Sequence, residues 1–172
     1  KNIFTYVANI IDNLNINIVD ARIITLKGNR ALDTYLLLDQ KGEFIKDTHT
    51  LEFLKNKISD LLRNPEFKMS EVTKKQTESI STFKNFVNID VSQKSNNLLI
   101  EITTLDHPGL LSKICESFDS RNLMIKDAKI ATLGEEANDI FTVFSADKKV
   151  LLFSDIEAIK HSIKLKISEL YN

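Results

Sequence analysis

The chain has few of the residues that build disulfides, metal clusters and phosphate-binding loops. Cys115 is the only cysteine in 172 residues, which excludes an internal disulfide and a CxxC metal or redox motif and favours a cytoplasmic origin. The 4 glycines are scattered and form no Gly-rich loop. Basic and acidic residues number 23 and 24 and are interleaved, so the formal net charge is only −1. This distribution gives no electrostatic footprint for nucleic acid, and we expect no nucleic-acid partner.

Long apolar runs and targeting signals are also missing. No run approaches the length needed to span a membrane, so no membrane association is expected, and no signal-peptide pattern is present. Lys1 opens the chain without an initiator methionine, so we expect the chain to be part of a longer protein. Hydrophobic residues make up 42% of the chain, enough for two modest cores. Cys115 shares a predicted helix face with Leu111, Ile114 and Phe118, which indicates a packing role.

A strand-like segment occurs twice. IVDARIITL at 18–26 recurs as IKDAKIATL at 125–133, with 6 of 9 residues identical. In the second copy, a strand, a Pro-Gly turn and an amphipathic helix precede this segment. Alignment of the copies places Lys1 opposite Pro108, so the first copy lacks its opening strand. The chain is therefore predicted to contain two copies of one small module.

The first copy is predicted to form a helix, two strands and a second helix. Asp47 or Thr48 caps the second helix, and Asn64-Pro65 ends it. The other elements are a helix at about 3–13, strands at 16–26 and 31–39, and a turn at 27–30. A polar linker at 65–85 follows.

The second copy is predicted to begin with a hairpin and to end with a helix. Asp106 or His107 caps its first helix, with Pro108 in the first turn, and a capping box of Ser154 and Glu157 starts its last helix. The strands are predicted at 86–92, 98–104, 123–133 and 138–146.

Each copy thus has the order β-α-β-β-α and lacks the sixth element of a ferredoxin-like fold. We predict an α+β chain of two such modules, with antiparallel sheets and helices on one face. The first module covers 1–64, the linker 65–85 and the second module 86–172. The strand at 86–92 is predicted to fill the empty edge slot of the second module. The edges left open in the first module are expected to be covered by pairing, within the chain or in a homodimer.

The residues also carry a family resemblance. TTLDHPGLLSKICESFDSRNLMIKDAKIATLGEEANDIFTVFSAD resembles the last ACT domain of the bifunctional uridylyltransferase and uridylyl-removing enzymes, which modify the nitrogen regulator PII. NIFTYVANIIDNLNINIVDARIITLKGNRALDTYLLLD resembles the ACT domain before it. The resemblance implies a glutamine-sensing C-terminal region that acts on cytoplasmic PII through the parent catalytic domains.

The chemistry of such enzymes is absent from the sequence. Nucleotidyl transfer needs carboxylates that hold Mg²⁺ beside a Gly-rich turn, and a metal-dependent UMP hydrolase needs a His-Asp cluster. The chain has neither, and His49, His107 and His161 lie in separate segments. We expect no cofactor in this chain and Mg²⁺ in the parent enzyme.

The turn at Asp106–Leu111 is the predicted ligand site. A helix start offers unpaired backbone N–H groups, so Gly109, Leu110 and Leu111 suit an α-carboxylate. Asp106 or Asp127 is predicted to take the α-amino group. The alternative is that Asp-x-Pro-Gly starts a helix without any ligand.

Asp20 and Asp127 occupy equivalent positions of the two repeated strands. Each forms either a surface charge pair with the cation two residues later, or part of a ligand-binding or domain-pairing surface. Asn17, opposite Met124 in the alignment, is predicted to complete one composite site with the second copy's turn. Two functions follow: an allosteric amino-acid sensor, or a pairing module that binds no small molecule.

Overall fold

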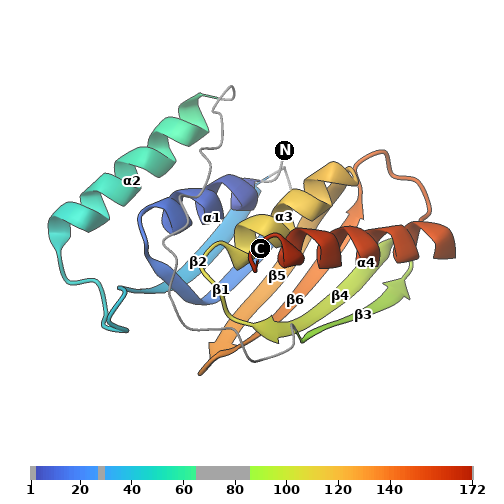
Figure 1. Cartoon of the computed structure of the whole chain (residues 1–172). Coiled ribbons are helices and arrows are strands. Elements are labelled where there is room, and N and C mark those ends of the chain that lie inside the picture. The colour runs from blue at the N-terminus through green and yellow to red at the C-terminus, as the bar shows by residue number, and fades with distance from the viewer. Residues whose placement is uncertain (1–2, 27–29, 65–85, 172) are drawn as a thin grey trace.

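The chain forms four helices and one six-stranded antiparallel sheet within the residues that the computed structural model describes, 3–26, 30–64 and 86–171 (Figure 1). The helices are α1 (Ile3–Asn13), α2 (Thr48–Arg63), α3 (Leu110–Ser120) and α4 (Phe153–Ser168). The strands are β1 (Asn17–Leu26), β2 (Arg30–Leu38), β3 (Val87–Lys94), β4 (Asn97–Leu105), β5 (Leu123–Leu133) and β6 (Glu136–Ser145). The predicted α+β class is confirmed.

The second module has the predicted strand order. Strand β3 pairs antiparallel with β4, from Val87 opposite Thr104 to Lys94 opposite Asn97. It therefore fills the edge slot beside β4, as predicted, and β6 and β5 complete this half of the sheet. Helices α3 and α4 pack on each other over one face. This arrangement is the ferredoxin-like one.

The two modules share a single sheet, whereas the sequence predicts a separate sheet for each. Strand β1 pairs antiparallel with β5, and Arg22 lies opposite Lys129. β1 is an edge strand of the predicted first module, and β5 is an edge strand of the predicted second module. Their pairing therefore provides hydrogen-bond partners for the open backbone N–H and C=O groups of both strands. The first module's edge at β1 is thus covered within the chain.

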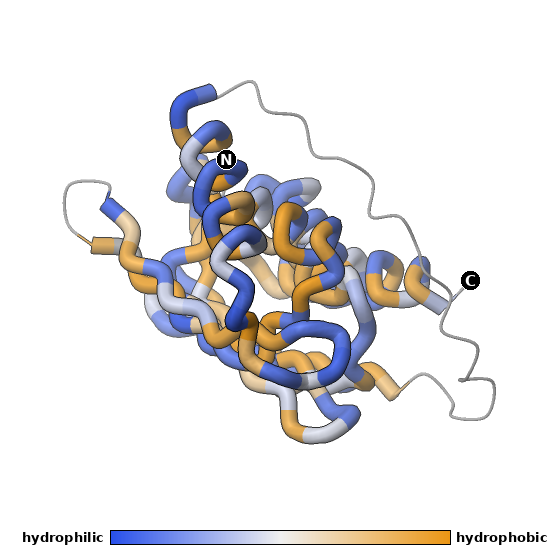
Figure 2. The backbone as a smooth tube through the Cα atoms, turned by 90° about the vertical axis from the view of Figure 1, so that its left-hand side faces the viewer, coloured by the Kyte–Doolittle hydropathy of each residue, from blue (hydrophilic) through white to orange (hydrophobic). Residues whose placement is uncertain are grey.

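The core also runs across the junction. Phe4 and Ala8 of α1 and Ala21 and Ile23 of β1 belong to the same buried cluster as the apolar residues of β4, β5, β6, α3 and α4. Cys115 is 0% exposed within this cluster, which confirms its predicted packing role. Figure 2 shows hydrophobic and hydrophilic residues alternating along the helices and strands, consistent with a sheet covered on one face.

Helix α2 stands apart from the shared core. It packs on α1 and buries Leu54 and Leu61 in a smaller cluster with residues of α1 (Figure 1). The Asp47 carboxylate accepts hydrogen bonds from the backbone N–H groups of His49 and Thr50, at 3.2 and 2.9 Å, which confirms the predicted cap. The turn at 27–29 and the linker at 65–85 lie outside the described residues, and the module boundaries remain predictions.

Two helix starts differ from those predicted. The N-cap of α3 is Gly109, at φ 86°, rather than Asp106 or His107, because a left-handed residue is needed to turn the chain into the helix. Helix α4 begins at Phe153. Its first turn is closed by the Asp155 carboxylate, which accepts from the Leu152 N–H at 2.9 Å, so the predicted capping box of Ser154 and Glu157 is wrong.

The outer edge of β2 remains open within the part of the chain that the structure describes. Apart from an isolated bridge between Leu38 and Phe44, no described strand pairs with it. Leu32 and Leu36 on this strand are 54% and 45% exposed. Between residues 3 and 171, the described helices include none long and apolar enough to cross a membrane.

Candidate ligand site at the start of helix α3

The turn between β4 and α3 is held in place from two sides. The Asp106 N–H donates to the carbonyl oxygen of Glu135 at 2.8 Å, which ties the turn to the β5–β6 connection. The Leu110 N–H donates to the carbonyl oxygen of His107 at 2.9 Å. This local bond uses one of the three amides that the sequence assigns to a ligand carboxylate. Gly109, Leu110 and Leu111 are all buried.

A carboxylate from the first module already lies at this helix start. The Ser112 hydroxyl donates to Oδ2 of Asp12, in the last turn of α1, and the backbone N–H groups of Gly109 and Ser112 donate to the same carboxylate. The first turn of α3 therefore binds an anionic carboxylate in the way that helix starts commonly do. Sequence reasoning missed Asp12. The available signal was an acid in the last turn of a helix, where the helix dipole disfavours negative charge.

Asp106 lies near this carboxylate, and Asp139 lies near Asp106. Burial raises the pKa of Asp12 to about 6, although its three hydrogen bonds act in the opposite direction and Asp106 raises it further. Asp139 of β6 is 2% exposed, and burial raises the pKa of its carboxyl to about 7. Its carboxylate accepts from the Ala131 N–H, whereas Oδ1 has no hydrogen-bond partner among the described residues. Desolvation also raises the pKa of Asp106.

The end of the chain closes another side of the turn. The Tyr171 hydroxyl donates to the carbonyl oxygen of Leu105 at 3.3 Å, and its ring meets the His107 ring edge-on at 5.5 Å. Lys113 of α3 forms an ion pair with Glu169, just after α4, at 2.9 Å. The turn is therefore bordered by α1, by the β5–β6 connection and by the segment after α4.

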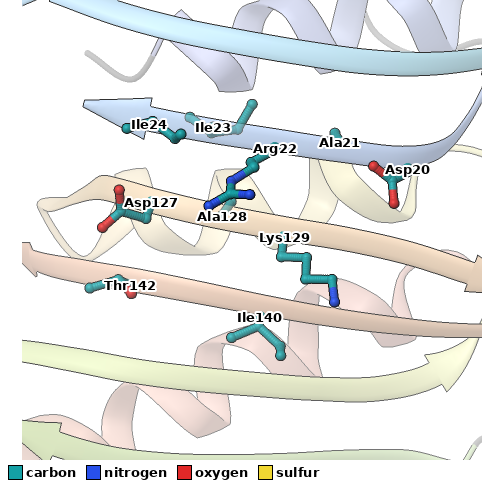
Figure 3. A pocket seen from close by; sticks show the side chains of 10 residues that line it. All are labelled: Asp20, Ala21, Arg22, Ile23, Ile24, Asp127, Ala128, Lys129, Ile140 and Thr142. Carbon is teal, nitrogen blue, oxygen red and sulfur yellow. The ribbon is translucent and has the colours of Figure 1, made fainter. Parts of the chain in front are cut away.

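Asp20 and Asp127 lie elsewhere. With Arg22 and Lys129 they line a shallow depression of about 560 Å³ on the sheet face away from the helices (Figure 3). Asp127 pairs with Thr142 and Leu105 with Glu136, which places them six residues apart along β6, about 20 Å. A single amino acid cannot reach both places, so the predicted grouping of Asp127 with the α3 turn is wrong.

The register explains why these charges recur. Asp20 lies opposite Ala131 and Asp127 opposite Ile24, so the repeated strands are related by a local twofold axis between Arg22 and Lys129. Each aspartate is diagonal to the other strand's cation. Figure 3 shows the two cations on neighbouring strands with an aspartate at either end. This arrangement favours the domain-pairing interpretation of Asp20 and Asp127.

Asn17 lies at the same end of the sheet as the α3 turn. Asn17 begins β1, three residues before Asp20, and Asp20 pairs with Ala131 near the end of β5, from which the β5–β6 connection that holds Asp106 continues. Its side-chain amide donates to the carbonyl oxygen of Asp39 at 3.3 Å and is exposed. The structure therefore brings Asn17 towards the turn but gives its amide a partner in the first module.

Comparisons with known proteins agree with the fold. The ACT-like domain of plant bHLH transcription factors matches residues 88–168, which cover most of the second module. A bifunctional uridylyltransferase/uridylyl-removing enzyme of Acinetobacter baumannii (strain ATCC 17978) is 32% identical over 99% of the chain. Enzymes of the same name from Psychrobacter cryohalolentis and Psychrobacter sp. (strain PRwf-1) are 30% and 32% identical over 94% of the chain.

The match covers only one region of these relatives. The chain spans 20% of the Acinetobacter enzyme and 18% of each Psychrobacter enzyme. The match nevertheless includes nearly all of both modules. Fold and comparisons together show that the second module matches an ACT-like domain and that the whole chain is similar to a region of the bifunctional uridylyltransferase/uridylyl-removing enzymes, which confirms the resemblance predicted from its sequence.

Proposed function

We propose that the chain is the amino-acid-sensing regulatory region of a cytoplasmic uridylyltransferase/uridylyl-removing enzyme. Glutamine binds at the start of α3 and thereby controls the uridylylation of PII by catalytic domains outside this chain, which use Mg²⁺. The observation that carries the proposal is the carboxylate of Asp12 on the first turn of α3. Donors that hold one carboxylate suit the α-carboxylate of an amino acid equally well.

The surroundings of the turn supply a counterpart for the α-amino group. Asp106 lies next to the turn, and Asp139 has an unpartnered oxygen in the adjacent buried layer. An ammonium group close to these carboxylates favours their charged forms and offsets the cost of their desolvation. Asp106 is the nearer candidate because the turn itself carries it, and Asn17 is available at the same end of the sheet.

Binding at this place can influence the relation between the modules. The turn belongs to the second module, whereas Asp12, which accepts the Ser112 hydrogen bond there, belongs to the first, so a ligand at the turn alters a contact between the modules. A ligand with different affinity for two module arrangements shifts the population between them. This is the physical requirement for an allosteric signal to a neighbouring catalytic domain.

The second candidate function is a pairing module without a small-molecule ligand. The continuous sheet through β1 and β5 favours it, because the shared sheet and core explain the repeated segment without any ligand. In that case the Asp12 carboxylate is simply a helix cap supplied by the neighbouring module.

Calorimetric titration of the chain with each of the twenty amino acids separates the two functions. We expect glutamine to bind, and Asp106→Ala to weaken binding about ten- to a hundredfold through loss of a charge-assisted contact. Asp90→Ala, an exposed substitution on β3, is the matched control and should bind as the wild type does. If glutamine at millimolar concentration neither binds nor raises the melting temperature, the pairing module is the correct function.

A further inference from the structure

The carboxylate of Asp12 occupies the donors that a ligand at the α3 turn would need. The Gly109 N–H, the Ser112 N–H and the Ser112 hydroxyl all donate to it, and the Leu110 N–H is already bonded to His107. A second carboxylate cannot share these positions with the first, because two anions would then compete for one set of donors. A bound ligand and a bound Asp12 therefore exclude each other.

We propose that Asp12 is an internal competitor, which an α-carboxylate ligand displaces from the start of α3. This inference rests on the proposed function and specifies how binding at that site is regulated. In the free chain Asp12 closes the site. In the bound chain the ligand carboxylate takes over its three hydrogen bonds, and the last turn of α1 moves away from α3.

The position of Asp12 makes it replaceable. It lies in the last turn of α1, where the carbonyl end of the helix dipole disfavours a negative charge. It is also partly buried, and the neighbouring Asp106 carries charge of the same sign. A free ligand brings the same carboxylate to the same donors without the adverse position at the end of α1. The contact of Asp12 with the start of α3 therefore closes the site in the free chain, and a ligand carboxylate can replace it.

Displacement acts on one particular link between the modules. Helix α1 packs on α3, and the hydrogen bond from Ser112 to Asp12 joins residues 100 positions apart along the chain. The β1–β5 pairing in the sheet is a separate link between the modules and contains neither residue. Loss of the Asp12 contact therefore loosens the helix layer while the sheet stays paired. This difference allows the modules to move about the β1–β5 junction.

The test compares glutamine affinity across substitutions at one position in the 172-residue chain. Asp12→Asn removes the charge with little change in size, and we expect it to bind glutamine about tenfold more tightly, because a larger fraction of the chain is then open to the ligand. Asp12→Glu keeps the charge and should not tighten binding. Asp90→Asn, an exposed acid-to-amide change on β3, is the control for loss of charge and should leave the affinity unchanged.

Hydrogen–deuterium exchange on the wild-type chain gives a second readout that does not depend on whether a variant folds. Glutamine should increase exchange in the segment 10–16, which contains the end of α1, and decrease it in 109–113. Unchanged or slower exchange in 10–16 with bound glutamine overturns the inference.

The outcomes separate the inference from the proposed function. Tighter binding by Asp12→Asn than by the wild type supports the inference, and it supports the proposed function only where the wild type also binds. Equal or weaker binding by Asp12→Asn, with a wild type that does bind, overturns the inference and leaves the sensor in place. Weaker binding would indicate that Asp12 contacts the ligand's ammonium group. If neither chain binds glutamine, the proposed function fails and the inference fails with it.

Discussion

Asp139→Asn removes a buried acid whose ionisation opposes folding. Asp139 is 2% exposed, and burial raises the pKa of its carboxyl from 3.8 to about 7. Because the folded pKa lies above the unfolded one, the folded chain binds the proton more tightly, and the free energy of unfolding falls as the pH rises through this interval. The full loss is about 4 kcal/mol, since one pKa unit is worth about 1.4 kcal/mol.

Urea unfolding at about pH 5 and about pH 8 measures this effect. The wild-type chain should lose about 2 to 3 kcal/mol between these two values because of Asp139. The pKa of Asp12, raised to about 6 by burial, adds roughly 1 kcal/mol of loss in the same direction. Asp139→Asn keeps an oxygen that accepts from the Ala131 N–H and carries no charge. It should therefore remove most of the pH dependence.

The matched control is Asp90→Asn, which changes an exposed acid on β3 and should keep the wild-type pH dependence. A wild-type chain whose unfolding free energy is constant or rises from pH 5 to pH 8 would refute the reasoning. So would an Asp139→Asn chain with the same pH dependence as the wild type.

Three further predictions concern the stability of the fold, and each is checked by urea unfolding. Phe118→Ala removes a 0% exposed ring that meets Phe141 edge-on, and should cost about 3 to 5 kcal/mol. Gly109→Ala forces a side chain into the left-handed region at φ 86° and should cost roughly 1 to 2 kcal/mol. Ala21→Leu overfills the 0% exposed junction between β1 and β5 and should cost about 1 to 3 kcal/mol. Costs below about 0.5 kcal/mol would contradict these assignments.

The second module could be predicted from the sequence almost element by element. Its signals are local: the alternation in β3, the Pro-Gly turn before α3 and the apolar face that contains Phe118. The residues that cap the helices were harder to predict from the sequence. Gly109 caps α3 through its backbone angles alone, and the Asp155 bond to Leu152 depends on where the preceding segment enters α4. The residue that caps each helix depends on the direction from which the backbone enters it, and the pattern of side chains along the sequence does not specify that direction.

The junction and the site could be predicted only in part. The repeat shows that β1 and β5 are equivalent, but equivalence does not reveal that equivalent strands pair with each other. For the same reason Asp127 was assigned to the wrong site. Asp12 was missed because its partner, Ser112, lies 100 residues away and becomes a neighbour only when α1 packs on α3.

The local twofold axis between Arg22 and Lys129 has a consequence for how the halves can differ. In a symmetric homodimer every substitution occurs at both ends of the interface. Here the two halves of the interface are separate segments of one chain, so a substitution can occur at one end of the interface without occurring at the other. The aligned positions already differ: Ser112 corresponds to Thr5, Met124 to Asn17 and Lys129 to Arg22. One end can therefore specialise in recognition while the other keeps the halves together.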